Sequence, residues 1–146
     1  MRSRDFLTLE GTSREELREV LDLARDMSDG RLTSPLAGKT VCLAFFEAST
    51  RTAVSFELAA RRSGADVISL SENGSAIAKG ESLVDTVVTL DSLGADTLVL
   101  RHPSAGAAKL AARHARAAVV NAGDGRGQHP TPVSYTHLTL PTNREV

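Results

Sequence analysis

Four short apolar segments alternate with segments of helical periodicity along most of the chain, and this alternation constrains the fold more than any other feature. Each apolar segment is rich in β-branched and aliphatic residues, which is typical of a strand buried on both faces of a parallel sheet. The sequence therefore predicts an α/β fold, a four-stranded parallel sheet with helices on both faces. The predicted strands are residues 40–46, 66–70, 96–100 and 118–121, and the predicted helices are residues 13–27, a helix opening at 49–52, 83–90 and 105–117.

The residues that directly follow each predicted strand are the candidate functional site. Ligands of such folds bind beyond the carboxyl ends of the parallel strands. After all four predicted strands, the chain continues with polar, basic or hydroxyl-bearing residues. We therefore expect four loops to converge on one edge of the sheet, namely residues 47–52, 71–79, 101–102 and 128–129.

Composition excludes several classes of partner. The 146 residues suffice for one ordinary domain, and 17 basic against 18 acidic side chains give a net charge of -1, which attracts neither nucleic acid nor an anionic membrane. No apolar run has the length of a membrane span, and the charged N-terminus lacks the apolar stretch of a secretory signal. Cys42 is the only cysteine, which rules out an internal disulfide and fits a reducing compartment. We therefore expect a cytoplasmic protein.

Ser49, Thr50, Arg51 and Thr52 stand where the first predicted strand gives way to a helix. A helix N-terminus offers free amide donors and the positive end of the helix dipole, and both suit an anion. The hydroxyls add donors, and the Arg51 guanidinium is a planar cation that matches phosphate oxygens. An ordinary hydroxyl N-cap followed by a solvated arginine is the alternative, and such caps are the commoner case.

Three further basic residues follow later predicted strands. Lys79 lies in a loop from which it could reach a bound anion, although a solvated lysine is the common alternative. Arg101 could polarise a carbonyl group or hold a phosphate, and His129 could stabilise an oxyanion as a neutral imidazole. The cysteine and the scattered histidines lack metal-ligand spacing, and no Gly-x-Gly-x-x-Gly motif or nucleophile elbow is present. No metal or cofactor is therefore expected.

Taken in order, these motifs resemble the signatures of the carbamoyltransferase family. They are Phe-Phe-Glu-Ala-Ser-Thr-Arg-Thr at 45–52, Lys-Gly-Glu-Ser at 79–82, Leu-Arg-His-Pro at 100–103, and Asn-Ala-Gly-Asp-Gly at 121–125 leading to Gln-His-Pro-Thr at 128–131. Both order and spacing agree with the family. The Lys-Gly-Glu loop with a preceding serine and the Arg-His-Pro triplet are similar to the aspartate branch rather than the ornithine branch.

The resemblance implies a fold, a reaction and a set of roles. Residues 1–131 would be the carbamoyl-phosphate-binding first domain of an enzyme of pyrimidine biosynthesis that joins carbamoyl phosphate and L-aspartate into N-carbamoyl-L-aspartate and phosphate, without a cofactor. The enzyme would be a homotrimer with shared sites, to which regulatory or dihydroorotase-type subunits could be added. By this resemblance, the phosphate is held by Ser49, Thr50, Arg51 and Thr52, the carbonyl is polarised by Thr52, Arg101 and His129, and Ser75 and Lys79 enter from a neighbouring subunit.

The sequence departs from the family pattern at two positions. Ala53 stands where the family often has a second arginine, and Pro132 stands where a glutamine contacts the carbamoyl amino group. From residue 132 onward the motif resemblance ends, so residues 132–146 are expected to be a foreign or disordered tail, with the aspartate-binding domain absent. The chain alone is then expected to bind carbamoyl phosphate without transferring it. An ornithine or other carbamoyltransferase, a non-catalytic anion-binding module and a generic doubly wound scaffold remain alternatives.

Overall fold

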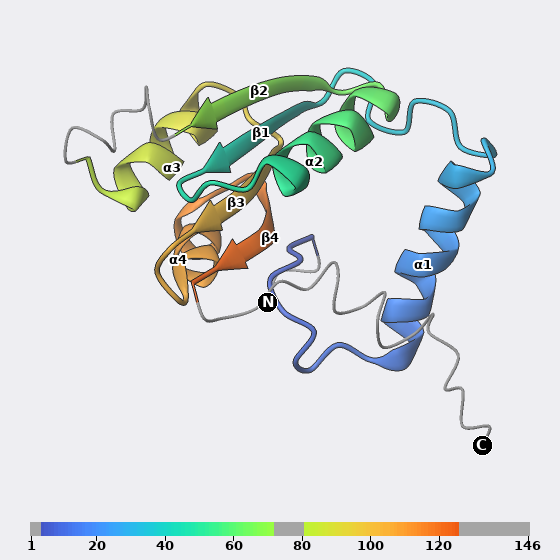
Figure 1. Cartoon of the computed structure of the whole chain (residues 1–146), viewed down its shortest axis with the longest axis horizontal. Helices are drawn as coiled ribbons and strands as arrows, with labels where there is room; N and C mark the ends of the chain where they lie inside the picture. The colour runs from blue at the N-terminus through green and yellow to red at the C-terminus, as the bar shows by residue number, and fades with distance from the viewer. Residues whose placement is uncertain (1–3, 72–80, 126–146) are drawn as a thin grey trace.

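A parallel sheet of four strands forms the centre of the molecule, as the sequence predicts (Figure 1). The computed structural model describes residues 4–71 and 81–125. The strands lie in the order β2-β1-β3-β4, and all three neighbouring pairs are parallel. The strands are β1 (Thr40–Phe45), β2 (Asp66–Ser71), β3 (Thr97–His102) and β4 (Ala118–Asp124), and the helices are α1 (Arg14–Ser28), α2 (Thr50–Arg62), α3 (Leu83–Ser92) and α4 (Ala107–His114).

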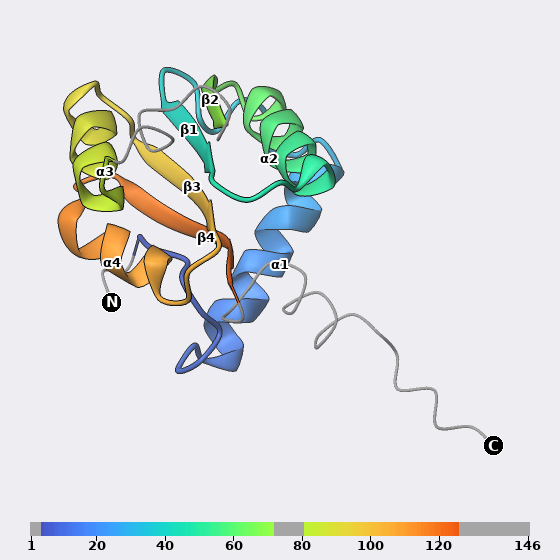
Figure 2. The same cartoon turned by 60° about the vertical axis from the view of Figure 1, so that its left-hand side comes forward.

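The chain order of the strands creates a switch point between β1 and β3. From β1 the chain passes through α2 to β2 on one side, and it then returns through α3 to β3 on the other side of β1. Helix α2 covers one face of the sheet, and α3 and α4 cover the other face (Figure 2). In open α/β sheets this reversal leaves a crevice at the carboxyl ends of the two strands, where ligands bind.

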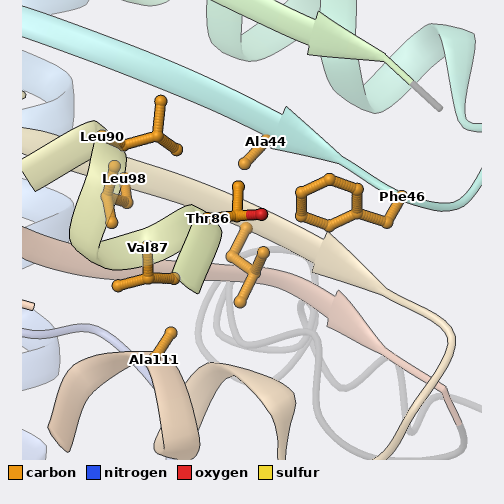
Figure 3. A pocket seen from close by; sticks show the side chains of 8 residues that line it. Ala44, Phe46, Thr86, Val87, Leu90, Leu98 and Ala111 are labelled. Carbon is orange, nitrogen blue, oxygen red and sulfur yellow. The ribbon is translucent and has the colours of Figure 1, made fainter. Parts of the chain in front are cut away.

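The alternation of side chains along β1 builds two apolar layers. Val41, Leu43 and Phe45 pack with Ala60 of α2, whereas Cys42 and its alternate neighbours face α3 and α4. Every residue of β1 after Thr40 is buried, which explains why this strand has a continuous apolar sequence. Figure 3 shows the second layer, where β1 and β3 meet α3 and α4 through Ala44, Phe46, Thr86, Val87, Leu90, Leu98, Leu100 and Ala111.

Helix α1 has the N-terminal capping box that its sequence predicts. The Ser13 hydroxyl accepts a hydrogen bond from the Glu16 amide at 3.1 Å, and the Glu16 carboxylate accepts from the Ser13 amide at 2.7 Å. None of the residues of α1 is buried, however, and Figure 1 shows the helix to one side of the sheet. The apolar stripe that predicted the helix is therefore not part of the core of this chain, and Val20 is 44% exposed.

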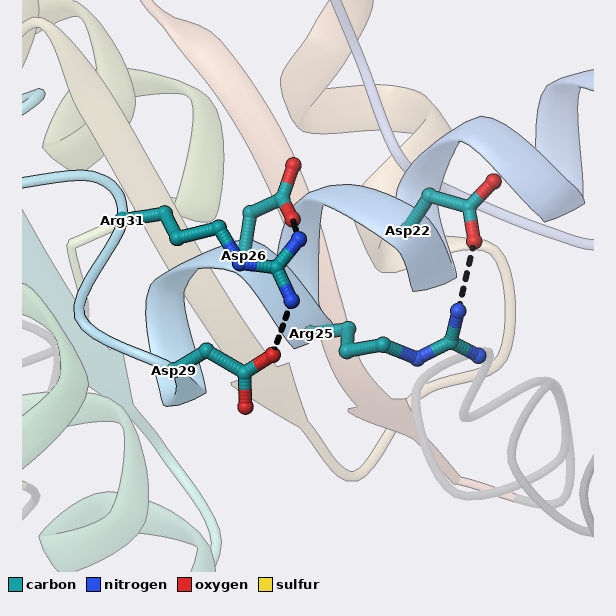
Figure 4. Close-up of polar contacts among 5 residues, drawn as sticks. All are labelled: Asp22, Arg25, Asp26, Asp29 and Arg31. Carbon is teal, nitrogen blue, oxygen red and sulfur yellow. Dashed lines mark hydrogen bonds and ion pairs between the residues drawn. The ribbon is translucent and has the colours of Figure 1, made fainter.

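Exposed ion pairs lie at the end of α1 and in the turn that follows it (Figure 4). Arg31 pairs with Asp26 at 2.6 Å and also with Asp29, and Arg25 pairs with Asp22 at 3.2 Å. Pairs this exposed contribute little to stability, on the order of 0–1 kcal/mol each. They therefore indicate a solvated surface rather than a functional site.

Helix α4 is shorter than the predicted 105–117. It begins only after Gly106, which is left-handed with φ 83, and it ends at His114. The next residues leave the helix because the Asp91 carboxylate, at the end of α3, accepts from the amides of Arg116 at 3.0 Å and Ala117 at 2.7 Å. Burial raises the pKa of Asp91, but these amides and the Arg116 guanidinium outweigh burial and leave the pKa below its usual value.

Two predicted strands end later than the sequence indicated. Strand β3 continues through Arg101 and His102, which were expected to lie just after it. Strand β4 continues through Asp124, although residues 122–127 were expected to form a glycine-rich turn. The extra residues remain in the ladder because β3 and β4 stay paired as far as His102 and Asp124, across an irregularity between Leu100 and His102.

The N-terminal segment adds a contact that the sequence did not reveal. The Phe6 amide donates to the Val119 carbonyl at 2.8 Å, and the Asn121 amide donates to the Phe6 carbonyl at 2.9 Å. Phe6 thereby forms a parallel bridge with Val120. The Asp5 carboxylate also accepts from the Val119 amide at 3.0 Å, so this short segment covers the outer edge of β4.

Candidate anion-binding site at the carboxyl edge of the sheet

The switch point between β1 and β3 brings together the end of one strand and the start of a helix. Glu47 follows β1, Ser49 is the N-cap of α2, and Arg101 lies near the end of β3, with Phe45 of β1 as its register partner. The Phe46 amide continues the ladder by donating to the Arg101 carbonyl at 2.8 Å. The sequence prediction that polar side chains gather at this edge is therefore met for the loops after β1 and β3.

Arg101 is held by two contacts at this edge. Its side chain is 20% exposed, its Nη1 donates to the Ala122 carbonyl at 2.9 Å, and its Nη2 pairs with the Glu47 carboxylate at 3.1 Å. Its Nε is buried and has no hydrogen-bond partner within the described residues. A buried guanidinium nitrogen without a partner costs free energy, so this side chain has donor capacity that a ligand could satisfy.

The first turn of α2 presents donors toward solvent. The Ser49 hydroxyl makes no N-cap bond to the helix and instead donates to the Thr52 hydroxyl at 2.8 Å. The alternative of an ordinary hydroxyl N-cap therefore holds only for the position of Ser49. Ser49 is the N-cap residue of α2, but its hydroxyl does not make the hydrogen bond that such a cap makes. The first turn holds no acidic side chain, and both Thr50 and Arg51 are exposed. The positive end of the helix is thus not neutralised by its own side chains.

His102 has a packing role at this edge. Its ring meets the Phe46 ring edge-on with centroids 5.8 Å apart, and its Nδ1 accepts from the Ser104 amide at 3.0 Å. Burial lowers the pKa of His102, and the nearby Asp124 carboxylate opposes this only in part. The lowered pKa favours the neutral imidazole, whose unprotonated Nδ1 can accept this bond from the loop.

Three of the predicted site residues lie outside the described residues. These are Ser75, Lys79 and His129. Within residues 4–71 and 81–125, no group of His, Cys, Asp and Glu side chains is arranged to hold a metal ion. In the same part of the chain, no helix is both long and apolar enough to cross a membrane.

Two groups of this edge received no role from the sequence. Glu47 was recognised only as part of the motif at 45–52, and its contact with Arg101 joins positions far apart in the chain. The Ala122 carbonyl is a main-chain group that no residue type can signal. The one available hint for Glu47 was its charge, because an acidic residue inside an otherwise anion-binding motif is well placed to pair with one of the cations of the site.

The fold and this edge define the chain as an α/β domain with a candidate anion-binding site at the switch point of its parallel sheet. Residues 4–140 match the family model described as the carbamoyl-P binding domain of aspartate/ornithine carbamoyltransferase, and the chain belongs to that family. The predicted family and fold are thus confirmed. The match continues to residue 140, beyond Thr131, where the resemblance by motifs ends.

The similar proteins point to the aspartate branch. The chain is 79% identical over 131 residues to the aspartate carbamoyltransferase catalytic subunit of Rubrobacter xylanophilus, covering 90% of this chain and 43% of that protein. It is 49% identical over 144 residues to the catalytic subunit of Chloroflexus aggregans, covering 95% of this chain and 47% of that protein. The chain therefore spans less than half the length of these curated relatives.

Solved structures agree with this relationship. Aspartate transcarbamoylase from Trypanosoma cruzi in complex with carbamoyl phosphate superposes with a TM-score of 0.82 at 37% identity, over 93% of this chain and 43% of that one. The catalytic subunit of M. Jannaschii aspartate transcarbamoylase superposes with a TM-score of 0.83 at 41% identity, over 91% of this chain and 45% of that one. Identities of 37% and 41% mean that this chain resembles these structures in sequence as well as in fold.

Proposed function

We propose that this chain is the carbamoyl-phosphate-binding part of an aspartate carbamoyltransferase. In the complete reaction the amine of L-aspartate attacks the carbonyl carbon of carbamoyl phosphate, and phosphate leaves, which yields N-carbamoyl-L-aspartate for pyrimidine biosynthesis. The observation that supports the proposal is the ion pair at 3.1 Å between the Arg101 guanidinium and Glu47, which stands two residues before Ser49, the N-cap of α2. The N-terminus of α2 is suited to a phosphate, and the Arg101 guanidinium is suited to a carbonyl oxygen.

In this proposal the first turn of α2 binds the phosphate. The amides at the start of α2 and the hydroxyls of Ser49, Thr50 and Thr52 donate to its oxygens, and the exposed Arg51 supplies the charge-assisted contact. The Ser49 hydroxyl and the Thr52 hydroxyl already lie 2.8 Å apart, so both would be on the same side of the first turn. As the phosphate leaves, its growing negative charge is met by donors that are in place beforehand.

Arg101 would act on the other end of the ligand. Together with Thr52 and His129, it would donate to the carbonyl oxygen and stabilise the negative charge that forms there when the amine attacks. No covalent intermediate or cofactor is needed, because catalysis consists of positioning and electrostatic stabilisation.

The remaining parts of the proposal concern the assembled enzyme. Ser75 and Lys79 would complete the site of a neighbouring subunit in a homotrimer, with regulatory or dihydroorotase-type subunits as further partners, in the cytoplasm. The domain would comprise residues 1–131, and aspartate would be bound by a second domain that corresponds to the unmatched length of the relatives. We propose that this chain by itself binds carbamoyl phosphate and does not form carbamoyl-aspartate.

Calorimetric titration of the chain with carbamoyl phosphate tests this proposal. Arg51→Ala is expected to weaken binding by more than tenfold, since charge-assisted hydrogen bonds are worth about 1.5–3 kcal/mol. Arg61→Ala is the matched control, because Arg61 lies on the same helix and pairs with Glu57 at 3.0 Å on the surface. Equal affinity of the two variants, or no binding by the parent chain, would refute the proposal. Formation of carbamoyl-aspartate by the purified chain would refute its last part.

A further inference from the structure

The peptide group between Ala122 and Gly123 links Arg101 to a buried asparagine. The Ala122 carbonyl accepts from Arg101 Nη1 at 2.9 Å, and the Gly123 N–H donates to Asn121 Oδ1 at 2.9 Å. This peptide bond is trans, so its C=O and N–H point in opposite directions within one plane. The bond to Asn121 therefore determines where the carbonyl that holds Arg101 points.

The pairing of β3 and β4 does not by itself fix the orientation of this peptide group. Leu100 pairs with Asn121, but His102 pairs with Asp124, so β4 advances three residues while β3 advances two. The extra residue is a bulge opposite Arg101, and bulges typically redirect a side chain next to a functional site. Gly123 lies in the bulge with φ 120, which L side chains rarely adopt. Ladder hydrogen bonds alone do not orient a peptide in a bulge.

Asn121 can orient this peptide group because its own side chain is buried and held by hydrogen bonds. It is 1% exposed, and its Nδ2 donates to the Leu7 carbonyl at 2.9 Å. Its backbone amide donates to the Phe6 carbonyl. The two contacts also assign the side-chain amide, since the Leu7 carbonyl requires a donor and the Gly123 N–H requires an acceptor.

We propose that Asn121 is a positioning residue that orients Arg101 through the Ala122–Gly123 peptide, and the inference rests on the proposed role of Arg101 toward the carbonyl oxygen. Asn121 does not touch the ligand. It keeps the Ala122 carbonyl directed at Nη1, so that this side of the guanidinium has a fixed position. Without it, the peptide can rotate and Arg101 keeps only the Glu47 contact.

The variant Asn121→Leu tests the proposal in the complete chain. It has a similar size and makes no hydrogen bond, and it is expected to lower the affinity for carbamoyl phosphate about tenfold in calorimetry. Asp5→Ala is the matched control, because Asp5 joins the same N-terminal segment to β4 through Val119 and does not contact the peptide. It is expected to leave the affinity within about twofold, although it also costs stability. An equal loss in Asp5→Ala would overturn the proposal.

A double-mutant cycle distinguishes positioning from general loosening. If Asn121 acts through Arg101, Asn121→Leu has no further effect on affinity in an Arg101→Ala background. The same loss in both backgrounds would overturn the proposal. Should Asn121→Leu fail to fold, Asn121→Ala removes the same Oδ1 acceptor without added bulk and is expected to give a similar, about tenfold, loss of affinity. Unchanged affinity in that folded variant would count against the proposal.

A measurement without ligand separates this inference from the proposed function. The side-chain N–H signals of Arg101, assigned by their disappearance in Arg101→Ala, are expected to exchange slowly with water in the parent chain and faster in Asn121→Leu. Unchanged exchange would overturn the positioning role. Faster exchange in a chain that does not bind carbamoyl phosphate would uphold the positioning role and refute the proposed function alone.

Discussion

Replacing Glu47 by glutamine should strengthen the binding of carbamoyl phosphate. The Glu47 carboxylate holds Arg101 at 3.1 Å, so a ligand that uses the same guanidinium must compete with it. The carboxylate also repels the phosphate. Glu47→Gln removes both effects while keeping the size of the side chain.

The structure sets the magnitude of this effect. The Arg101 side chain is 20% exposed and that of Glu47 is 43% exposed, so water screens the pair and its contribution is about 0.5–1 kcal/mol rather than that of a buried pair. Removing the competition should therefore lower the dissociation constant by about two- to fivefold. The gain should shrink at high salt, because screening weakens both the ion pair and the repulsion.

Calorimetric titration of Glu47→Gln with carbamoyl phosphate at low and high salt tests this prediction. Glu57→Gln is the matched control, since Glu57 pairs with Arg61 on the surface of α2 at 3.0 Å and has no contact with Arg101. A weakening of tenfold in Glu47→Gln would refute the reasoning, because it would show that Glu47 orients Arg101 for the ligand instead of competing with it.

Three further predictions concern stability and reactivity. Asp91→Ala should cost about 1–3 kcal/mol in urea denaturation because the amide of the buried Ala117 loses its acceptor. Folding lowers the pKa of Asp91, so the stability that it provides should be present above about pH 4 and lost below, and an unchanged acid midpoint would contradict this. Burial raises the pKa of the Cys42 thiol to about 11, so a thiol reagent at pH 8 should modify it only in denaturant. Rapid labelling of the folded chain would refute this. Gly125→Ala should destabilise the chain by at least about 2 kcal/mol, because the added Cβ would lie 2.3 Å from the Pro103 carbonyl oxygen. Gly38→Ala, at a residue with φ 73 and open space around it, should cost about 1 kcal/mol, and equal shifts of the melting temperature would contradict the steric argument.

Local sequence patterns predicted the architecture because strand and helix signals agreed along the chain. The continuous apolar sequence around Leu43 reflects burial on both faces, and the capping box at Ser13 marks the start of α1 at the observed residue. Boundaries were less accurate where tertiary contacts decide them. Helix α4 ends early since Asp91, from another helix, captures the amides that follow it.

The candidate site was predictable where side chains carry the chemistry. The hydroxyls and Arg51 at the start of α2, and Arg101 at the end of β3, are visible as residue types that follow strands. The support of Arg101 was not visible, because it comes from a bulge, a main-chain carbonyl and an asparagine whose role depends on contacts across the sheet. A single sequence carries no signal for such contacts between distant positions.

The most direct test of the central claim is a titration of the 15N-labelled chain with carbamoyl phosphate, followed by its backbone amide signals. If the N-terminus of α2 and Arg101 form one site, the amides of Thr50, Arg51, Thr52 and Arg101 should shift together with a single dissociation constant. Shifts that cluster at the opposite edge of the sheet, or shifts at α2 and at Arg101 with different dissociation constants, would contradict the account.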